Sequence, residues 1–156
     1  MKRKMRFKKF KKFIPEESSP VNEKFINYLM VDGKKTTARK IFNETLKIVS
    51  KKMASDPEKV FKQAIDNVKP NMEVKAKRIG GAVYQVPREV KPDRQLSLAF
   101  RWIITSARNG KGAPMAQKLA NEFIEAANKQ GNAFKKKEET HRMAQANKAF
   151  AHFAKY

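Results

Sequence analysis

The chain has 156 residues, a length that suits one domain with a single hydrophobic core. Its 36 Lys and Arg residues against 15 Asp and Glu residues give a net charge of +21, which favours a polyanionic partner. We find no transmembrane run, signal peptide or lipidation motif, so nucleic acid is a better candidate partner than a membrane. The lack of cysteine excludes disulfides, thiol catalysis and thiolate metal sites.

Residues 1–14 form a basic tail that contains no acidic residue. Phe7, Phe10 and Phe13 recur at every third position in it. Such a block repels itself when it is isolated, whereas phosphate groups can order it and the rings can pack or stack. A solvated targeting tail is the alternative. The tail cations expected to bind RNA are Lys2, Arg3, Lys4, Arg6, Lys8, Lys9, Lys11 and Lys12.

Capping residues and apolar residues at helical spacing predict six helices. Two of them start with a capping residue followed by proline, a favourable pair at a helix start. Lys34 and Lys35 are expected in the turn before the second helix. The expected helices run from Ser19–Pro20 to about Asp32–Gly33, from a cap at Thr36 or Thr37 to about Met53, from Asp56–Pro57 to Pro70, from Lys91–Pro92 to about Asn109, from Pro114 to Gly131, and from about Phe134 towards Phe153.

A β-hairpin is predicted over residues 73–90, where two β-branched and aromatic runs meet at Gly80–Gly81. A two-residue turn pairs Ile79 with Ala82 and Lys77 with Tyr84. Neither face is cleanly apolar, and we see no further strand that could complete a sheet. We therefore expect an arm held at its base by the helices and along its length by an anion, although a hairpin packed on a sheet is the alternative. The arm cations are Lys75, Lys77 and Arg78.

The helix expected after Pro92 carries two opposed stripes at about 100° per residue. Its apolar stripe consists of Leu96, Phe100, Ile103 and Ala107. Arg94, Arg101 and Arg108 form a basic stripe on the other side, which suits a phosphate backbone better than a merely solvated face of mixed charge. Trp102 lies between the stripes, and we favour a core position beneath the hairpin base over a platform for base stacking. A basic loop with Lys111 follows this helix.

The last expected helix places Met143, Ala146, Phe150 and Phe153 in one arc and Lys148, His141 and His152 in the opposed arc. Glu138 and His141 could form an acid–base pair, but a surface contact on a lysine-rich helix is the simpler interpretation. The two histidines are too far apart to share a metal. Without a phosphate-binding loop, zinc pattern or nucleophile elbow, we predict neither an enzyme nor a cofactor.

Four segments in this order resemble the small-subunit ribosomal protein family "uS seven", bacterial or organellar type. They are Phe25–Lys35, Arg78–Pro87, Leu98–Trp102 and His141–His152. The resemblance spans almost everything from Pro15 to Phe153 and implies an all-α, six-helix domain with one protruding β-hairpin arm. It implies a primary binder of the 3′ major domain of small-subunit rRNA that nucleates assembly of the subunit head. The expected location is the ribosome of the cytoplasm rather than that of an organelle.

The resemblance also implies which positions face which partner. The tail, Lys34, Lys35, the three arm cations, the basic stripe and Lys111 would hold rRNA. The exit-site tRNA and the mRNA would face Gly80, Gly81, Tyr84, Arg142 and Lys148. The platform protein "uS eleven" would contact the C-terminal region.

Two rival functions remain open. An architectural protein that binds duplex DNA can also use a basic β-arm, but it places an apolar wedge at the tip, where this chain has Gly80–Gly81. An RNA-processing enzyme would need His141 and Glu138. With the ribosomal function as the main prediction, we expect a basic tail over residues 1–14 and a single helical rRNA-binding domain over residues 15–156, with the arm at 73–90.

Overall fold

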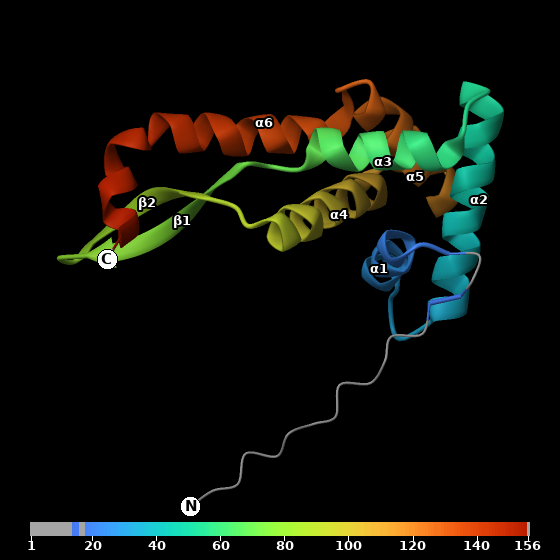
Figure 1. Cartoon of the computed structure of the whole chain (residues 1–156), viewed down its shortest axis with the longest axis horizontal. Coiled ribbons are helices and arrows are strands. Elements are labelled where there is room, and N and C mark those ends of the chain that lie inside the picture. Colours follow the sequence, from blue (N-terminus) through green and yellow to red (C-terminus); the bar gives the residue numbers. More distant parts are fainter. Residues whose placement is uncertain (1–13, 16–17, 156) are drawn as a thin grey trace, which may run out of the picture.

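The structure is a computed structural model, and it describes residues 14–15 and 18–155 of the chain. Its elements are α1 (Pro20–Leu29), α2 (Lys35–Met53), α3 (Pro57–Val68), β1 (Met72–Ile79), β2 (Ala82–Glu89), α4 (Pro92–Asn109), α5 (Met115–Ala127), α6 (Gly131–Ala146) and the 3₁₀-helix η1 (Lys148–Lys155). Helices α1 to α5 form a body, from which the hairpin projects with α6 alongside it (Figure 1). The predicted all-α domain with one protruding β-arm is confirmed.

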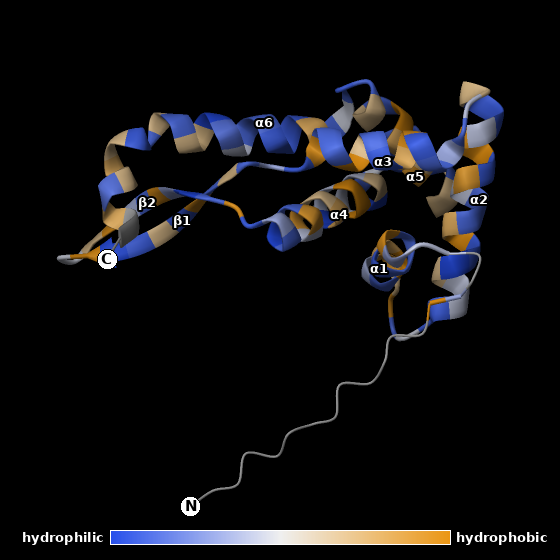
Figure 2. Cartoon of the chain, viewed as in Figure 1, coloured by the Kyte–Doolittle hydropathy of each residue, from blue (hydrophilic) through white to orange (hydrophobic). Residues whose placement is uncertain are grey.

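Five phenylalanine rings, one from each helix of the body, form the centre of the core. The ring of Phe25 lies 5.1 to 5.5 Å from the other four, centroid to centroid, and two of these contacts are edge-to-face. Such pairs add to the free energy gained by burial. The body helices carry apolar and polar stretches side by side, whereas α6 is mostly hydrophilic (Figure 2). The other four rings belong to Phe42, Phe61, Phe100 and Phe123.

Two of the expected helix starts are confirmed by their capping bonds. The Ser19 hydroxyl accepts a hydrogen bond from the backbone N–H of Asn22 at 3.1 Å, and the Asp56 carboxylate accepts one from Glu58 at 3.0 Å. The expected threonine cap of α2 is wrong, because the helix already begins at Lys35 after the positive-φ residue Gly33. Lys35 therefore lies in the first helical turn rather than in the preceding loop.

The hairpin has the register that the two-residue turn predicts. Ile79 is paired with Ala82 and Lys77 with Tyr84. The turn residues Gly80 and Gly81 have φ angles of +56° and +89°, a region in which residues with a Cβ are strained. A glycine pair is therefore what allows the two strands to be joined so tightly.

The end of the chain differs from the prediction in three ways. Gly131 does not end α5; it has a φ angle of +86° and is the first residue of α6. Helix α6 stops at Ala146, after which the chain continues as η1. The predicted arc of apolar residues is also wrong, because Met143 is 48% exposed and the buried positions of α6 include Ala144. The break before η1 lets the last aromatic residues turn towards the arm.

Candidate nucleic-acid interface

The base of the arm is fixed by one buried carboxylate. Glu73 of β1 accepts hydrogen bonds from Arg88 of β2 at 2.7 Å and from Arg94 of α4 at 2.9 Å. Burial raises the pKa of Glu73, but the hydrogen bonds and charges of Arg94 and Arg88 outweigh it, so the net shift is downward. The carboxylate is therefore ionised at neutral pH, and it ties both strands of the arm to α4.

This ion-pair cluster was not predicted from the sequence. A signal for half of it exists, since the hairpin register places Glu73 directly opposite Arg88, and opposite charges on facing strands attract. The contact with Arg94 depends on how α4 packs against the hairpin and has no local signal. The basic-stripe residue Arg94 is thus already engaged within the protein, although its side chain remains 47% exposed.

The arm presents its cations unequally. Lys75 and Arg78 are exposed, and neither has an ion-pair partner in the part of the chain that the structure describes. Lys77 is half-buried, and its ammonium donates a hydrogen bond to the carbonyl oxygen of Phe153 at 3.1 Å. The tip residues Gly80 and Gly81 are fully open to solvent. Two of the three predicted arm cations are therefore free for a ligand.

An aromatic cluster packs η1 against the arm; we call it the brace. The ring of Tyr84 lies 5.2 Å from those of both Phe150 and Phe153, centroid to centroid. The chain itself therefore supports one side of the arm that we had assigned to an anionic partner. Tyr84 is half-buried here, and its predicted contact with tRNA or mRNA stays a prediction.

The basic stripe on α4 separates into residues with different environments. Arg101 is exposed, and it has no hydrogen-bond or ion-pair partner among the described residues. Arg108 donates a hydrogen bond to the carbonyl oxygen of Leu29 at 3.2 Å, which helps to close the end of α1. The apolar stripe faces the core as predicted, with Phe100 and Ile103 fully buried. Only Arg101 is therefore wholly available to a phosphate.

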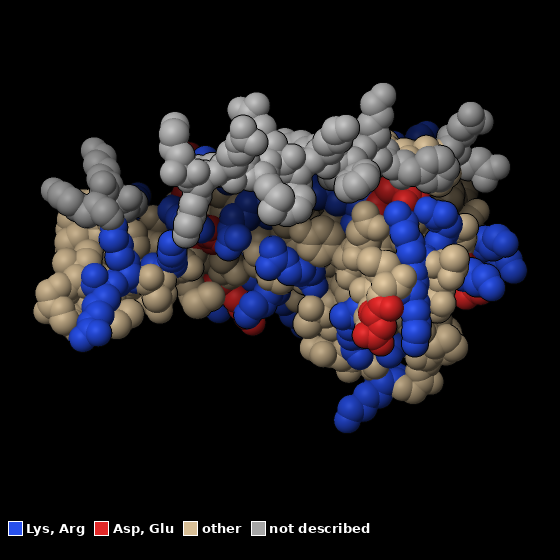
Figure 3. Space-filling view, turned by 90° about the horizontal axis from the view of Figure 1, so that it is seen from below, with Lys and Arg blue, Asp and Glu red and all other residues tan. Residues whose placement is uncertain are grey.

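Most of the remaining predicted positions are exposed at several places on the surface, but Lys35 is half-buried and paired with Glu23 at 3.0 Å. Lys34 precedes α2, Lys111 lies in the loop after α4, and Arg142 and Lys148 lie near the end of α6. Seen from below, Lys and Arg atoms gather on the arm and over the body, and Asp and Glu atoms form small separate patches (Figure 3). The predicted tail cations of residues 2–12 lie outside the described residues.

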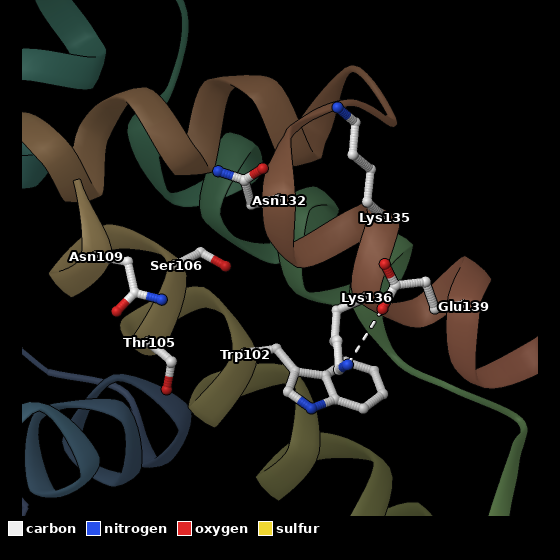
Figure 4. A pocket seen from close by; sticks show the side chains of 8 residues that line it. All are labelled: Trp102, Thr105, Ser106, Asn109, Asn132, Lys135, Lys136 and Glu139. Atoms are coloured by element: carbon white, nitrogen blue, oxygen red, sulfur yellow. Dashed lines mark hydrogen bonds and ion pairs between the residues drawn. The ribbon is translucent and has the colours of Figure 1, made fainter.

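A hollow of about 420 Å³ lies between α4 and α6. Trp102 and Thr105 line it from α4, and Lys136 and Glu139 line it from α6 (Figure 4). Trp102 is half-buried and packs against the core, but beside α6 rather than beneath the hairpin base. The hollow depends on how α4 and α6, which are separated in the sequence by α5, cross in space. The sequence alone therefore does not reveal it.

The histidine of the candidate acid–base pair makes a contact within the protein. His141 accepts a hydrogen bond at Nε2 from the backbone N–H of Asn71 at 3.1 Å, which requires that nitrogen to be unprotonated. Burial, together with the charge of Lys137, lowers the pKa of His141. No cluster of three or more His, Cys, Asp or Glu residues that could hold a metal occurs among the described residues. None of the helices described is long and apolar enough to span a bilayer.

Comparison with known proteins agrees with the resemblance. A family model described as "Ribosomal protein S7p/S5e" matches residues 2–148. Three proteins named "Small ribosomal subunit protein uS7" illustrate the similarity. The one from a Nitratiruptor species is 57% identical over 143 residues, covering 89% of this chain and 90% of the relative.

The relative from Maridesulfovibrio salexigens is 53% identical over 139 residues and covers 89% of each chain. The relative from Thermotoga petrophila is 57% identical over 130 residues, covering 83% of this chain and 84% of the relative. All three organisms are bacteria, so the bacterial type is confirmed, and the corresponding location is the ribosome of the cytoplasm. The chain belongs to the ribosomal protein S7p/S5e family, whose members are structural constituents of the small ribosomal subunit and not enzymes.

Proposed function

We propose that this protein is a primary binder of the 3′ major domain of small-subunit rRNA, and that its docking nucleates assembly of the subunit head. The observation that carries the proposal is the charge of the arm. Residues 74–88 contain four basic residues and no acidic residue, and Lys75 and Arg78 point their charges to solvent. A projecting element with one sign of charge suits a partner that carries a phosphate on every nucleotide.

The expected mode of recognition is shape. A-form RNA hides its base edges in a deep, narrow major groove, so proteins read folded RNA largely through its backbone and its single-stranded elements. Lysine, a flexible point charge, outnumbers arginine about three to one in this chain. A rigid body with basic arm, stripe and tail can touch several RNA helices at once, and specificity then comes from their relative positions.

The exit-site tRNA and the mRNA are proposed to lie beside the arm tip and the exposed side of α6. This is supported by the exposure of Gly80, Gly81, Arg142 and Lys148. The platform protein "uS eleven" is proposed to contact the C-terminal region. Ala149, Ala151 and His152 of η1 are exposed, which leaves a surface for such a neighbour.

The test is binding of the full chain to the isolated 3′ major domain rRNA and to duplex DNA of equal length, measured across a salt series. The logarithm of the affinity falls with the logarithm of salt by about 0.7 to 0.9 for each phosphate neutralised. We expect tight binding to the rRNA at salt concentrations that release the DNA, because shape recognition adds to charge. Release of both ligands at the same salt would instead support the architectural DNA-binding alternative.

A further inference from the structure

The hollow between α4 and α6 has the chemistry of a nucleotide site. Its walls combine an indole ring with side-chain amides and ammonium groups, and its volume of about 420 Å³ falls in the range of small-ligand pockets. Asn109 of α4 and Asn132 of α6 supply amides that can both donate and accept hydrogen bonds. The lining side chains come from two separate elements, α4 and α6 (Figure 4).

Trp102 provides the aromatic wall. Its side chain packs against the core, so its position is fixed, but it is only half-buried and opens on to the hollow. Unpaired bases stack on such aromatic faces in single-stranded RNA recognition, and tryptophan offers a large one. A fixed ring at the edge of the core can accept a base without first becoming ordered.

Two lysines provide positive charge on the opposite wall. Lys135 is exposed and has no ion-pair partner among the described residues. Lys136 is paired with Glu139 at 3.1 Å, and both side chains are more than half exposed. An exposed pair of this kind is weak, so a phosphate can compete for Lys136.

The hollow adjoins the basic stripe of α4. At about 100° per residue, Thr105 lies about 40° from Arg101 around the helix axis, and Trp102 lies about 100° from it. A phosphate backbone that follows Arg101 therefore passes the rim of the hollow. This continuity and the positive charge favour RNA as the occupant over a segment of a neighbouring protein.

We propose that the hollow receives one unstacked nucleotide of the bound rRNA, with its base against Trp102 and its phosphate at Lys135 and Lys136. The inference rests on the proposed function, since it takes rRNA as the ligand. It adds a contact that reads a single exposed base, whereas the other proposed contacts are made to the RNA backbone.

Tryptophan fluorescence tests the proposal directly, because Trp102 is the only tryptophan in the chain. The full chain is titrated with the isolated 3′ major domain rRNA while the emission and its quenching by acrylamide are followed. A stacked base is expected to quench the emission and to protect the ring from acrylamide. An unchanged emission, with tight rRNA binding, would overturn the proposal and leave the proposed function intact.

Two variants separate stacking from folding. Trp102→Leu removes the platform and is expected to weaken rRNA binding about tenfold or more, whereas Trp102→Phe keeps an aromatic face and should restore most of the affinity. Lys135→Ala, a surface change, should reduce the logarithmic salt slope by about 0.7, and Lys51→Ala on the distant α2 should not.

Equal affinities for Trp102→Leu and the wild type would show that no base stacks there. A response of Trp102 to a neighbouring small-subunit protein, but not to rRNA, would reassign the hollow to a protein interface and overturn the proposal. Failure of the wild-type chain to bind the rRNA tightly would overturn the proposed function and, with it, this site.

Discussion

Three glutamates are buried in the part of the chain that the structure describes, and they have two kinds of environment. Glu23 is paired with Lys35 and Arg39, and Glu73 is paired with Arg88 and Arg94. Burial raises the pKa of Glu23 and Glu73, but their cationic partners lower it further, and the net shift is downward in both. A carboxylate with a lowered pKa stabilises the fold above its unfolded-state pKa, and this contribution is lost as the pH falls through its folded-state pKa.

Glu122 is the third, and its pKa is shifted in the opposite direction. Burial raises it, the hydrogen bond from the backbone N–H of Ala133 offsets part of the effect, and the nearby Glu125 adds to the rise. The free energy of unfolding therefore falls as the pH rises above the pKa of Glu122 in the unfolded state, because ionisation is less favourable in the folded protein. The carboxylate is retained in a position where it caps the start of α6.

We predict opposite effects for two charge-removing variants. Glu73→Gln leaves two arginines without their counter-charge and should lower the free energy of unfolding by about 1–3 kcal/mol at pH 7. Glu122→Gln keeps an oxygen that can accept from Ala133 and should leave the protein at least as stable as the wild type. Urea unfolding at pH 7 and pH 4 measures both. At pH 4 the deficit of Glu73→Gln should shrink; a constant deficit would contradict the pKa argument.

Arg101 is the residue with which to test the basic stripe. Reversing all three stripe arginines would also remove the internal hydrogen bonds of Arg94 and Arg108 and would mix folding with binding. We predict that Arg101→Glu alone weakens binding to the 3′ major domain rRNA about tenfold in low salt while thermal unfolding stays unchanged. Lys51→Glu, which changes the charge equally on α2, is the control. Equal losses in the two variants would show that only net charge matters.

Among the elements, the arm depends most on its neighbours. A two-stranded hairpin is marginal by itself in water. Here it gains the ion-pair cluster around Glu73 at its base and the brace from Tyr84, Phe150 and Phe153 along one side. Without these contacts the strands would become ordered only on binding RNA, and the entropic cost of ordering would weaken the binding. We therefore infer that the arm is preorganised for binding.

Because the brace joins the arm to η1, we predict that local unfolding of one accompanies local unfolding of the other. Phe153→Ala removes a ring that contacts Tyr84 and should raise amide exchange across β1 and β2 about tenfold, with no change in α2 and α3. Hydrogen–deuterium exchange read by mass spectrometry or NMR measures this. Met143→Ala is the matched control, since it also shortens a large apolar side chain but one that is 48% exposed. Equal exchange in both variants would mean that the brace contributes nothing.

The tip of the arm can be shortened without touching the brace. Replacing residues 78–83 with a two-residue turn that joins Lys77 to Tyr84 keeps the brace and removes Arg78. We predict that docking to the isolated rRNA loses only the one phosphate contact of Arg78, whereas retention of exit-site tRNA and reading-frame maintenance in reconstituted subunits are clearly impaired. A large loss of rRNA docking would instead assign the tip to rRNA.

For the whole molecule, the dominant feature is repulsion among its own charges. A net charge of +21 on 156 residues opposes compaction, and salt screens that repulsion. We predict that raising NaCl from about 50 mM to about 500 mM raises Tm by about 2–4 °C in differential scanning calorimetry. Sorbitol of equal osmolality serves as the uncharged control. A fall in Tm with salt would mean that the ion pairs around Glu23 and Glu73 outweigh the repulsion.

The sequence predicts this architecture well where local chemistry decides it. Gly80–Gly81 specifies the turn, and the turn determines the strand register; the caps Ser19 and Asp56 locate two helix starts. The prediction fails at the end of α6, because this helix has a weak apolar pattern and the break at Asn147 lacks a glycine or proline signal.

The candidate site was harder to predict than the fold. Exposure of Arg101 follows from helical periodicity. Strand periodicity does not explain why Lys75 is exposed and Lys77 is not, because both lie on the same face of β1. The partners of Arg94 and Arg108 and the hollow at Trp102 come from contacts between elements far apart in the chain. Such contacts depend on packing angles, which a single sequence does not contain.

The ion pairs at Glu73 hold the arm stiffly at its base, so the direction of the whole arm depends on them. Each strand has eight residues, so the tip lies about 26 Å from the base at about 3.3 Å per residue. A rotation of the arm by about 5° at its base would displace the tip by about 2 Å over that length. Such a displacement exceeds the range of donor–acceptor distances in a hydrogen bond. One carboxylate near the helical body thus controls the position of the distant tip, and a change there alters the direction of the arm without altering any of the tip residues that we propose to contact RNA.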